Sequence, residues 1–103
     1  MTKKPESRRQ LKIRKALEKT VGGRWKKIHG GPFQPCMLDL VGCVGGLYFE
    51  FEVKEPGEEP SERQIHEIED IIKNGGVSMV IYTPEEAINA VQKALRLSKT
   101  SCR

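Results

Sequence analysis

The sequence predicts an α/β domain, a mixed sheet flanked by helices, in the order helix, three strands, helix, strand, helix. Three observations predict it. Two strand-like runs meet at Gly45-Gly46, the signal of a two-residue hairpin. Stretches with the helical spacing of apolar residues lie before and after this hairpin. A strand, a helix and a second strand then follow from Glu50 to Tyr82, which predicts a right-handed crossover between parallel strands.

The first helix is expected from about Glu6 to Val21, because Gly22-Gly23 ends its pattern. One face of this helix is predicted to be buried, and it carries Gln10, Ile13 and Leu17. A short strand from Arg24 to His29 should follow, with Trp25 or Ile28 packing inward.

The hairpin runs from Leu38 to Val44 and from Leu47 to Lys54. Side chains alternate between the two faces of a strand, so the apolar residues of the second run share one face and its charged residues share the other. A two-residue turn fixes the register and sets Asp39 opposite Glu52. Glu50 points to the same face as Glu52, opposite Val41. We expect it either to support the metal ligands without binding the metal itself or to be solvated.

The second half of the chain contains two capping boxes. Ser61 with Gln64 begins a helix that ends at Asn74-Gly75-Gly76, and Thr83 with Glu86 begins another that ends near Leu97. The predicted buried residues of the first of these helices are Ile65, Ile68 and Ile72. Those of the second are Ala87, Ile88, Val91, Ala94 and Leu95. Between the helices, residues 77–82 form an apolar strand that we expect to be covered on both faces.

Composition bounds the class of protein. With 103 residues the chain is expected to be one domain, residues 1–103, with flexible tails at 1–5 and 98–103. No segment approaches the ~20 apolar residues of a membrane span, and the charged N-terminus does not resemble a signal peptide. We therefore expect no membrane partner and a cytoplasmic location. Three cysteines without a CxxC pair argue against a disulfide framework or a structural zinc site.

Charge is unevenly distributed along the chain. Residues 1–29 hold eleven Lys/Arg and two acids, whereas residues 30–82 hold three Lys/Arg and ten acids. A basic arm beside an acidic segment fits a protein that binds a phosphate backbone and collects cations. The alternative is a solubilising helix beside ordinary acidic loops.

Asp39 and Glu52 form the chemically informative pair. Two carboxylates opposite each other repel unless a cation lies between them, and oxygen ligands suit a hard divalent ion. Lys54 adds an ammonium group on the same face. The alternative for Lys54 is a salt bridge to Glu52 or Glu50 on an exposed face.

Asp39 followed by Glu52-Val53-Lys54 and a helix opening with Gln64 resembles the PD-(D/E)XK nuclease superfamily. The segments around this motif resemble its stand-alone, phage-type VRR-NUC family over about residues 6–95. The matching blocks are Lys27-Ile28-His29-Gly30-Gly31-Pro32-Phe33-Gln34, Leu40-Val41-Gly42-Cys43, Phe51-Glu52-Val53-Lys54 and Gly75-Gly76. The chain differs from the family at Cys36 and Leu38, where the family has glycine and proline.

This resemblance implies a restriction-endonuclease-like core and a Mg²⁺- or Mn²⁺-dependent DNA endonuclease. Asp39, Glu52 and the Val53 carbonyl would hold the metal, and Lys54 would orient the attacking water. Gln64 would lie near the active site, although the capping box alone explains it. Glu6 would supply a third carboxylate; an ordinary acid in the first turn is its alternative, and Glu18 is the competing candidate.

The resemblance to stand-alone members also implies branched DNA as the substrate. A chain of about 100 residues has a small footprint, and a symmetric homodimer would present two sites to such DNA. We expect branched DNA such as a four-way (Holliday) junction, a symmetric homodimer, and a phage-infected or prophage-bearing bacterial host. The expected DNA-contacting residues are Arg8, Arg9, Lys12, Lys15, Lys26, Lys27, His29, Gly30 and Gly31.

Two alternatives stay open from the sequence. One is a nicking or flap nuclease that uses the same site. The other is a catalytically silent DNA-binding module, for which Cys36 and Leu38 would be early signs of decay. A general small α/β binding protein would explain neither the carboxylate pair nor the matching blocks.

Overall fold

The computed structural model describes residues 5–28 and 37–101, and it describes side chains for residues 8–28 and 37–99. Within these residues the elements follow the predicted order and confirm the α/β class. They are α1 (Pro5–Thr20), β1 (Arg24–Lys27), β2 (Leu40–Val44), β3 (Leu47–Val53), α2 (Glu62–Lys73), β4 (Val77–Ile81) and α3 (Pro84–Ser101).

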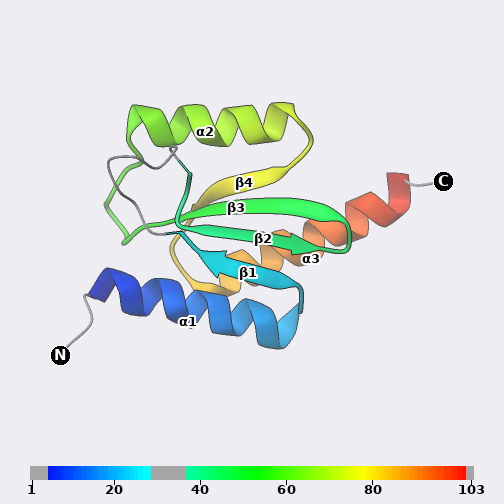
Figure 1. The fold of residues 1–103 in the computed structure, drawn as a ribbon, viewed down its shortest axis with the longest axis horizontal. Helices are drawn as coiled ribbons and strands as arrows, with labels where there is room; N and C mark the ends of the chain where they lie inside the picture. The colour runs from blue at the N-terminus through cyan, green and yellow to red at the C-terminus, as the bar shows by residue number, and fades with distance from the viewer. Residues whose placement is uncertain (1–4, 29–36, 102–103) are drawn as a thin grey trace.

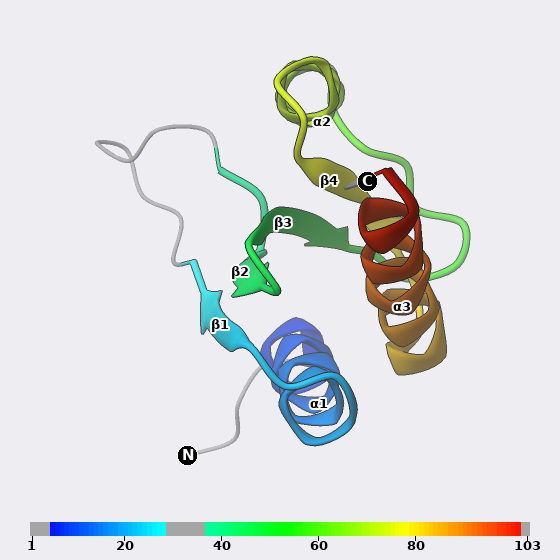
Figure 2. The ribbon, with the colours of Figure 1, turned by 90° about the vertical axis from the view of Figure 1, so that its right-hand side faces the viewer.

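The strands form one mixed sheet in the order β1-β2-β3-β4 (Figure 1). β1, β2 and β3 pair antiparallel, whereas β3 and β4 pair parallel through the crossover helix α2. Helix α2 packs on one face, over β3 and β4, and α1 and α3 lie together on the opposite face (Figure 2). The sheet therefore separates two different environments.

The predicted hairpin register is confirmed. Leu40 pairs with Phe51, Gly42 with Phe49, and Val44 with Leu47. Gly45 and Gly46 have φ values of 57° and 83°, the left-handed conformations that a two-residue turn needs and that glycine adopts without strain.

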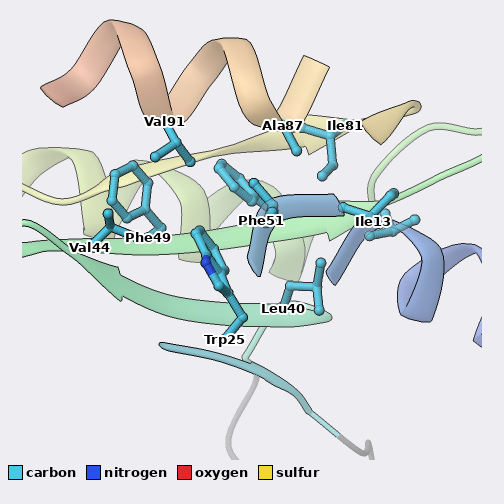
Figure 3. Packing of buried hydrophobic residues seen from close by; sticks show 11 residues of the cluster. Ile13, Trp25, Leu40, Val44, Phe49, Phe51, Ile81, Ala87 and Val91 are labelled. Atoms are coloured by element: carbon cyan, nitrogen blue, oxygen red, sulfur yellow. The ribbon is translucent and has the colours of Figure 1, made fainter. Parts of the chain in front are cut away.

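The main core fills the space between the sheet and helices α1 and α3 (Figure 3). Trp25, Phe49 and Phe51 form its centre, with ring centroids 5.6 to 6.0 Å apart. Trp25 packs inward, as one of the two predicted possibilities. It lies directly over Gly42, where an added Cβ would be 2.2 Å from the indole ring, so only glycine leaves room for the ring.

The predicted buried face of α2 is wrong for two of its three residues. Ile65 and Ile72 are 41% and 55% exposed, while Ile71 is 8% exposed. The reason is the strand face beneath the helix. β3 presents the carboxylates of Glu50 and Glu52 there, so α2 turns its polar residues toward the sheet and leaves two isoleucines outside.

The ends of the chain also differ from the prediction. Helix α3 continues to Ser101, so the expected tail from residue 98 is wrong for residues 98–101, and α1 already begins at Pro5. Residues 1–4 and 102–103 lie outside the described part. The apolar face of α3 is as predicted: Ala87 and Val91 are fully buried. No described helix is both long and apolar enough to cross a membrane.

Candidate active site

Asp39 lies immediately before β2 and is held there by two hydrogen bonds. Its carbonyl accepts the Ile28 amide at 2.8 Å, which extends the pairing of β1 and β2 by one step. Its Oδ2 accepts the Val53 amide at 3.0 Å. This second bond fixes the carboxylate against the end of β3, beside Glu52.

Glu52 is the centre of the group. It is 4% exposed, although it is a carboxylate near the end of a strand. The Gln64 side-chain amide donates to its Oε2 at 2.9 Å, and Lys54 Nζ lies 3.5 Å from the same oxygen. The structure thus brings the predicted residues Asp39, Glu52, Lys54 and Gln64 together.

Gln64 serves two purposes at once. Its Oε1 accepts the Ser61 amide at 2.8 Å and its backbone N–H donates to Ser61 Oγ at 3.2 Å, so the predicted capping box is present. Its Nε2 is left to donate to Glu52. The cap therefore aims the side-chain amide at the carboxylate.

The pKa of Glu52 is raised from 4.5 to about 7. Burial is the largest cause, and the neighbouring charge of Asp39 is the next, while Lys54 acts in the opposite direction. The two carboxylates repel each other when both are ionised, and a cation bound between them would remove that repulsion.

These residues fit a hard divalent cation. Mg²⁺ is commonly held by one or two carboxylates, with water and substrate phosphate completing its octahedral shell. Asp39 and Glu52 supply such a pair at a site with only oxygen and nitrogen donors. Among the described side chains no group of three or more His, Cys, Asp or Glu is placed to hold a metal ion. The side chain of Glu6, the expected third carboxylate, lies outside the described residues.

Glu18, the competing candidate for that third position, is not brought to the pair. It is exposed and pairs with Arg14 Nε at 3.3 Å. It lies nine residues beyond Arg9, or about 13 Å along the helix axis. Arg9, also on α1, reaches this end of the sheet: its Nη1 pairs with Glu55, one position after Lys54, at 2.7 Å.

Three of the predicted DNA-contacting residues share the outer face of α1. Arg8, Lys12 and Lys15 are exposed, and Lys19 extends the same row. Their separations of three and four residues place them on one side of the helix, opposite the buried Gln10, Ile13 and Leu17. We call these four residues the basic row of α1.

Three other predicted contacts, Arg9, Lys26 and Lys27, do not join this row. Lys26 and Lys27 are consecutive in β1, so their side chains point to opposite faces of the sheet. Arg9 is engaged by Glu55. His29, Gly30 and Gly31 lie outside the described residues.

Glu50 is a second buried carboxylate, and its hydrogen-bond partners were not predicted from the sequence. Glu50 is 1% exposed and therefore not solvated, and it accepts the Leu38 amide at 2.9 Å and the Tyr48 hydroxyl at 2.5 Å. The alternation of side chains along β3 predicted that Glu50 shares a sheet face with Glu52. The sequence did not predict its partners, because Leu38 belongs to a loop and Glu67 to α2.

A comparison with solved structures finds one described as "VRR_NUC domain". It matches with a TM-score of 0.63 and 19% sequence identity, over 82% of this chain and 95% of that chain. The chain therefore has the fold of that VRR_NUC domain, as the sequence resemblance implied. No family model matches the sequence. No curated protein matches it either.

Proposed function

We propose that this protein is a Mg²⁺- or Mn²⁺-dependent DNA endonuclease. The observation that carries the proposal is the convergence of Asp39, Glu52 and Lys54 at one end of the sheet. The likeness in fold to a VRR_NUC domain supports it. So does the order of Asp39, Glu52 and Lys54 in the chain, which resembles the PD-(D/E)XK motif. Hydrolysis would break one P–O bond of the DNA backbone and form another to the oxygen of water.

In this proposal Asp39, Glu52 and the Val53 carbonyl hold the cation. When bound, it would act as a Lewis acid on a phosphoryl oxygen and lower the pKa of a water molecule. Lys54 orients the attacking water and offsets the negative charge that develops on phosphorus oxygens. Gln64 keeps the Glu52 carboxylate in one orientation through its hydrogen bond to Oε2.

We further propose that the basic row of α1 contacts the phosphate backbone. The start of α1 adjoins the candidate site through the pair between Arg9 and Glu55. The row spans residues 8–19, about 16 Å at 1.5 Å per residue, and its four cations face away from the core. That length suits contacts to several phosphates of one strand. Specificity would then come from DNA shape.

Branched DNA and a homodimer complete the proposal. A two-fold symmetric dimer would present two identical sites, which suits the symmetric cleavage of a four-way junction. Light scattering after size exclusion should give twice the mass of one chain. A single-chain mass would remove the dimer from the proposal and leave the catalytic assignment standing.

The test is cleavage of labelled DNA. A four-way junction, a flap and a linear duplex are incubated with Mg²⁺, Mn²⁺ or chelator. Lys54→Ala is compared with Lys93→Ala, which removes an exposed lysine from α3. We expect metal-dependent cleavage, fastest on the junction, lost in Lys54→Ala and kept in Lys93→Ala.

Other outcomes separate the alternatives. Preference for the flap, or cleavage of one strand, would replace the junction assignment with a flap or nicking nuclease. DNA binding without cleavage in either metal would contradict the enzymatic proposal and favour a silent binding module.

A further inference from the structure

Glu50 is a buried carboxylate to which the proposed chemistry assigns no role. It lies two residues before Glu52 on the same face of β3, and it is 1% exposed. Among the described residues no lysine or arginine forms an ion pair with it. A buried carboxylate is costly unless hydrogen bonds satisfy it, so its partners explain how it is tolerated.

Those partners come from three separate parts of the chain. Oε1 accepts the backbone amide of Leu38, in the segment that enters β2. Oε2 accepts the hydroxyl of Tyr48, its neighbour on β3. The carboxyl group of Glu67, on α2, lies beside that of Glu50, and its interaction with Glu50, together with burial, raises the pKa of Glu67 to about 7.

Two of these partners lie next to residues of the candidate site. Leu38 directly precedes Asp39 and is fully buried. Glu67 follows Gln64 by three residues, which places both on the same side of α2, facing the sheet. One carboxylate thus connects the segment that carries Asp39 with the helix that carries Gln64, and both of those residues contact Glu52.

We propose that Glu50 is a positioning residue, whose carboxylate ties the Leu38–Asp39 segment to α2 and thereby sets the positions of Asp39 and Gln64 around Glu52. The link between the Leu38–Asp39 segment and α2 does not depend on the proposed nuclease activity. Its consequence for cleavage rests on the proposed function. The Leu38 amide needs an acceptor at this position, so an apolar replacement of similar size breaks the connection.

Glu50→Gln should keep most of the connection. The amide Oε1 can accept the Leu38 amide while its Nε2 donates to the Glu67 carboxylate. The side chain in Glu50→Leu can do neither. Tyr48→Phe is the matched control, since it removes one bond to Glu50 and leaves both links to Leu38 and Glu67.

The first measurement needs neither metal nor activity. In ¹⁵N spectra of the folded protein, we expect Glu50→Leu to speed hydrogen exchange at the Leu38 amide and to shift the Gln64 side-chain NH₂ resonances. Glu50→Gln and Tyr48→Phe should leave both near their original values. Unchanged Leu38 exchange and Gln64 resonances in Glu50→Leu would overturn the proposal.

The second measurement is kinetic. Loss of groups that orient metal ligands typically costs about 10–100-fold in activity. We expect a fall of that size in kcat for Glu50→Leu, with the Kd for DNA unchanged, and rescue to within about threefold by Glu50→Gln. A kcat in Glu50→Leu equal to that of the unaltered protein would also overturn the proposal.

Glu67→Met provides a second test in case the Glu50→Leu variant does not fold. It cuts the α2 end of the connection alone, so the Gln64 resonances should shift while Leu38 exchange stays slow. If neither changes, the connection does not position α2 and the proposal fails. Absence of cleavage by the unaltered protein on every DNA would sink the proposed function, whereas the spectra would still decide the role of Glu50.

Discussion

On the face of the sheet that α1 and α3 cover, β3 presents Phe49, Phe51 and Val53, all nearly or fully buried among apolar neighbours. On the α2 face the alternating residues Glu50 and Glu52 are just as buried, but their neighbours are polar. The same strand therefore stabilises the fold on one side and carries proposed catalytic residues on the other. Substitutions on the two faces should affect different properties.

The largest expected effect is on stability, from the apolar face. Phe51→Ala should lower the free energy of unfolding by about 3–5 kcal/mol, because it leaves a cavity beside Trp25. Urea denaturation followed by circular dichroism measures this loss. Ile72→Ala, which removes an isoleucine that is 55% exposed on α2, is the control and should change the value by under ~0.5 kcal/mol. Equal losses would mean that the apolar face is not the main core.

The next effect concerns metal binding and pH on the polar face. The pKa of Glu52 is raised from 4.5 to about 7, so a proton competes with the cation below pH 7. Mn²⁺ affinity measured by calorimetry should rise up to about tenfold per pH unit between pH 5 and 7, and level off above. Glu52→Gln should remove most of the binding. An affinity independent of pH over this range would contradict the proposed ligand pair.

The stability of the metal-free protein should change with pH in the opposite direction to the metal affinity. The folded protein keeps the Glu52 proton to a higher pH than the unfolded chain does. The contribution of this group to stability is therefore complete below about pH 4.5 and is lost as the pH rises through 7. Added Mn²⁺ should raise Tm more at pH 8 than at pH 5.5.

The smallest effect concerns the basic row of α1, which belongs to neither face. Each phosphate contact contributes about 0.9 to the slope of log Kobs against log salt for duplex DNA. Lys12→Gln should lower the magnitude of that slope by about 0.9. Lys73→Gln, at the far end of α2, should leave it unchanged. Equal slopes for both variants would show that DNA does not follow α1.

The sequence predicted the parts of the fold that local rules determine. The Gly45-Gly46 turn fixed the register, which set Asp39 beside Glu52, and the capping box placed Gln64 at the start of α2. The apolar stripe of α1 was also correct, because that helix packs on an apolar strand face.

The errors arose where one element depends on another. Ile65 and Ile72 were predicted to be buried from the helical spacing of the isoleucines alone, whereas the strand beneath α2, β3, presents Glu50 and Glu52 to it. Alternation gives the face on which Glu50 lies, but it cannot show which helix covers that face. Its link to Glu67 joins residues seventeen positions apart, and no local pattern predicts such a pairing.

We propose that the end of β3 that carries Glu52 forms the catalytic site. The most direct measurement is metal-dependent cleavage together with unfolding of Glu52→Gln, beside the exposed control Glu85→Gln. We predict that Glu52→Gln lowers the cleavage rate by about 10²–10³-fold, because it removes a proposed ligand of the cation that would stabilise charge in the transition state. Its metal-free stability at pH 8 should be equal or higher, because a buried charge beside Asp39 is gone. Cleavage at the rate of the control, or a loss of cleavage only through unfolding, would contradict the account.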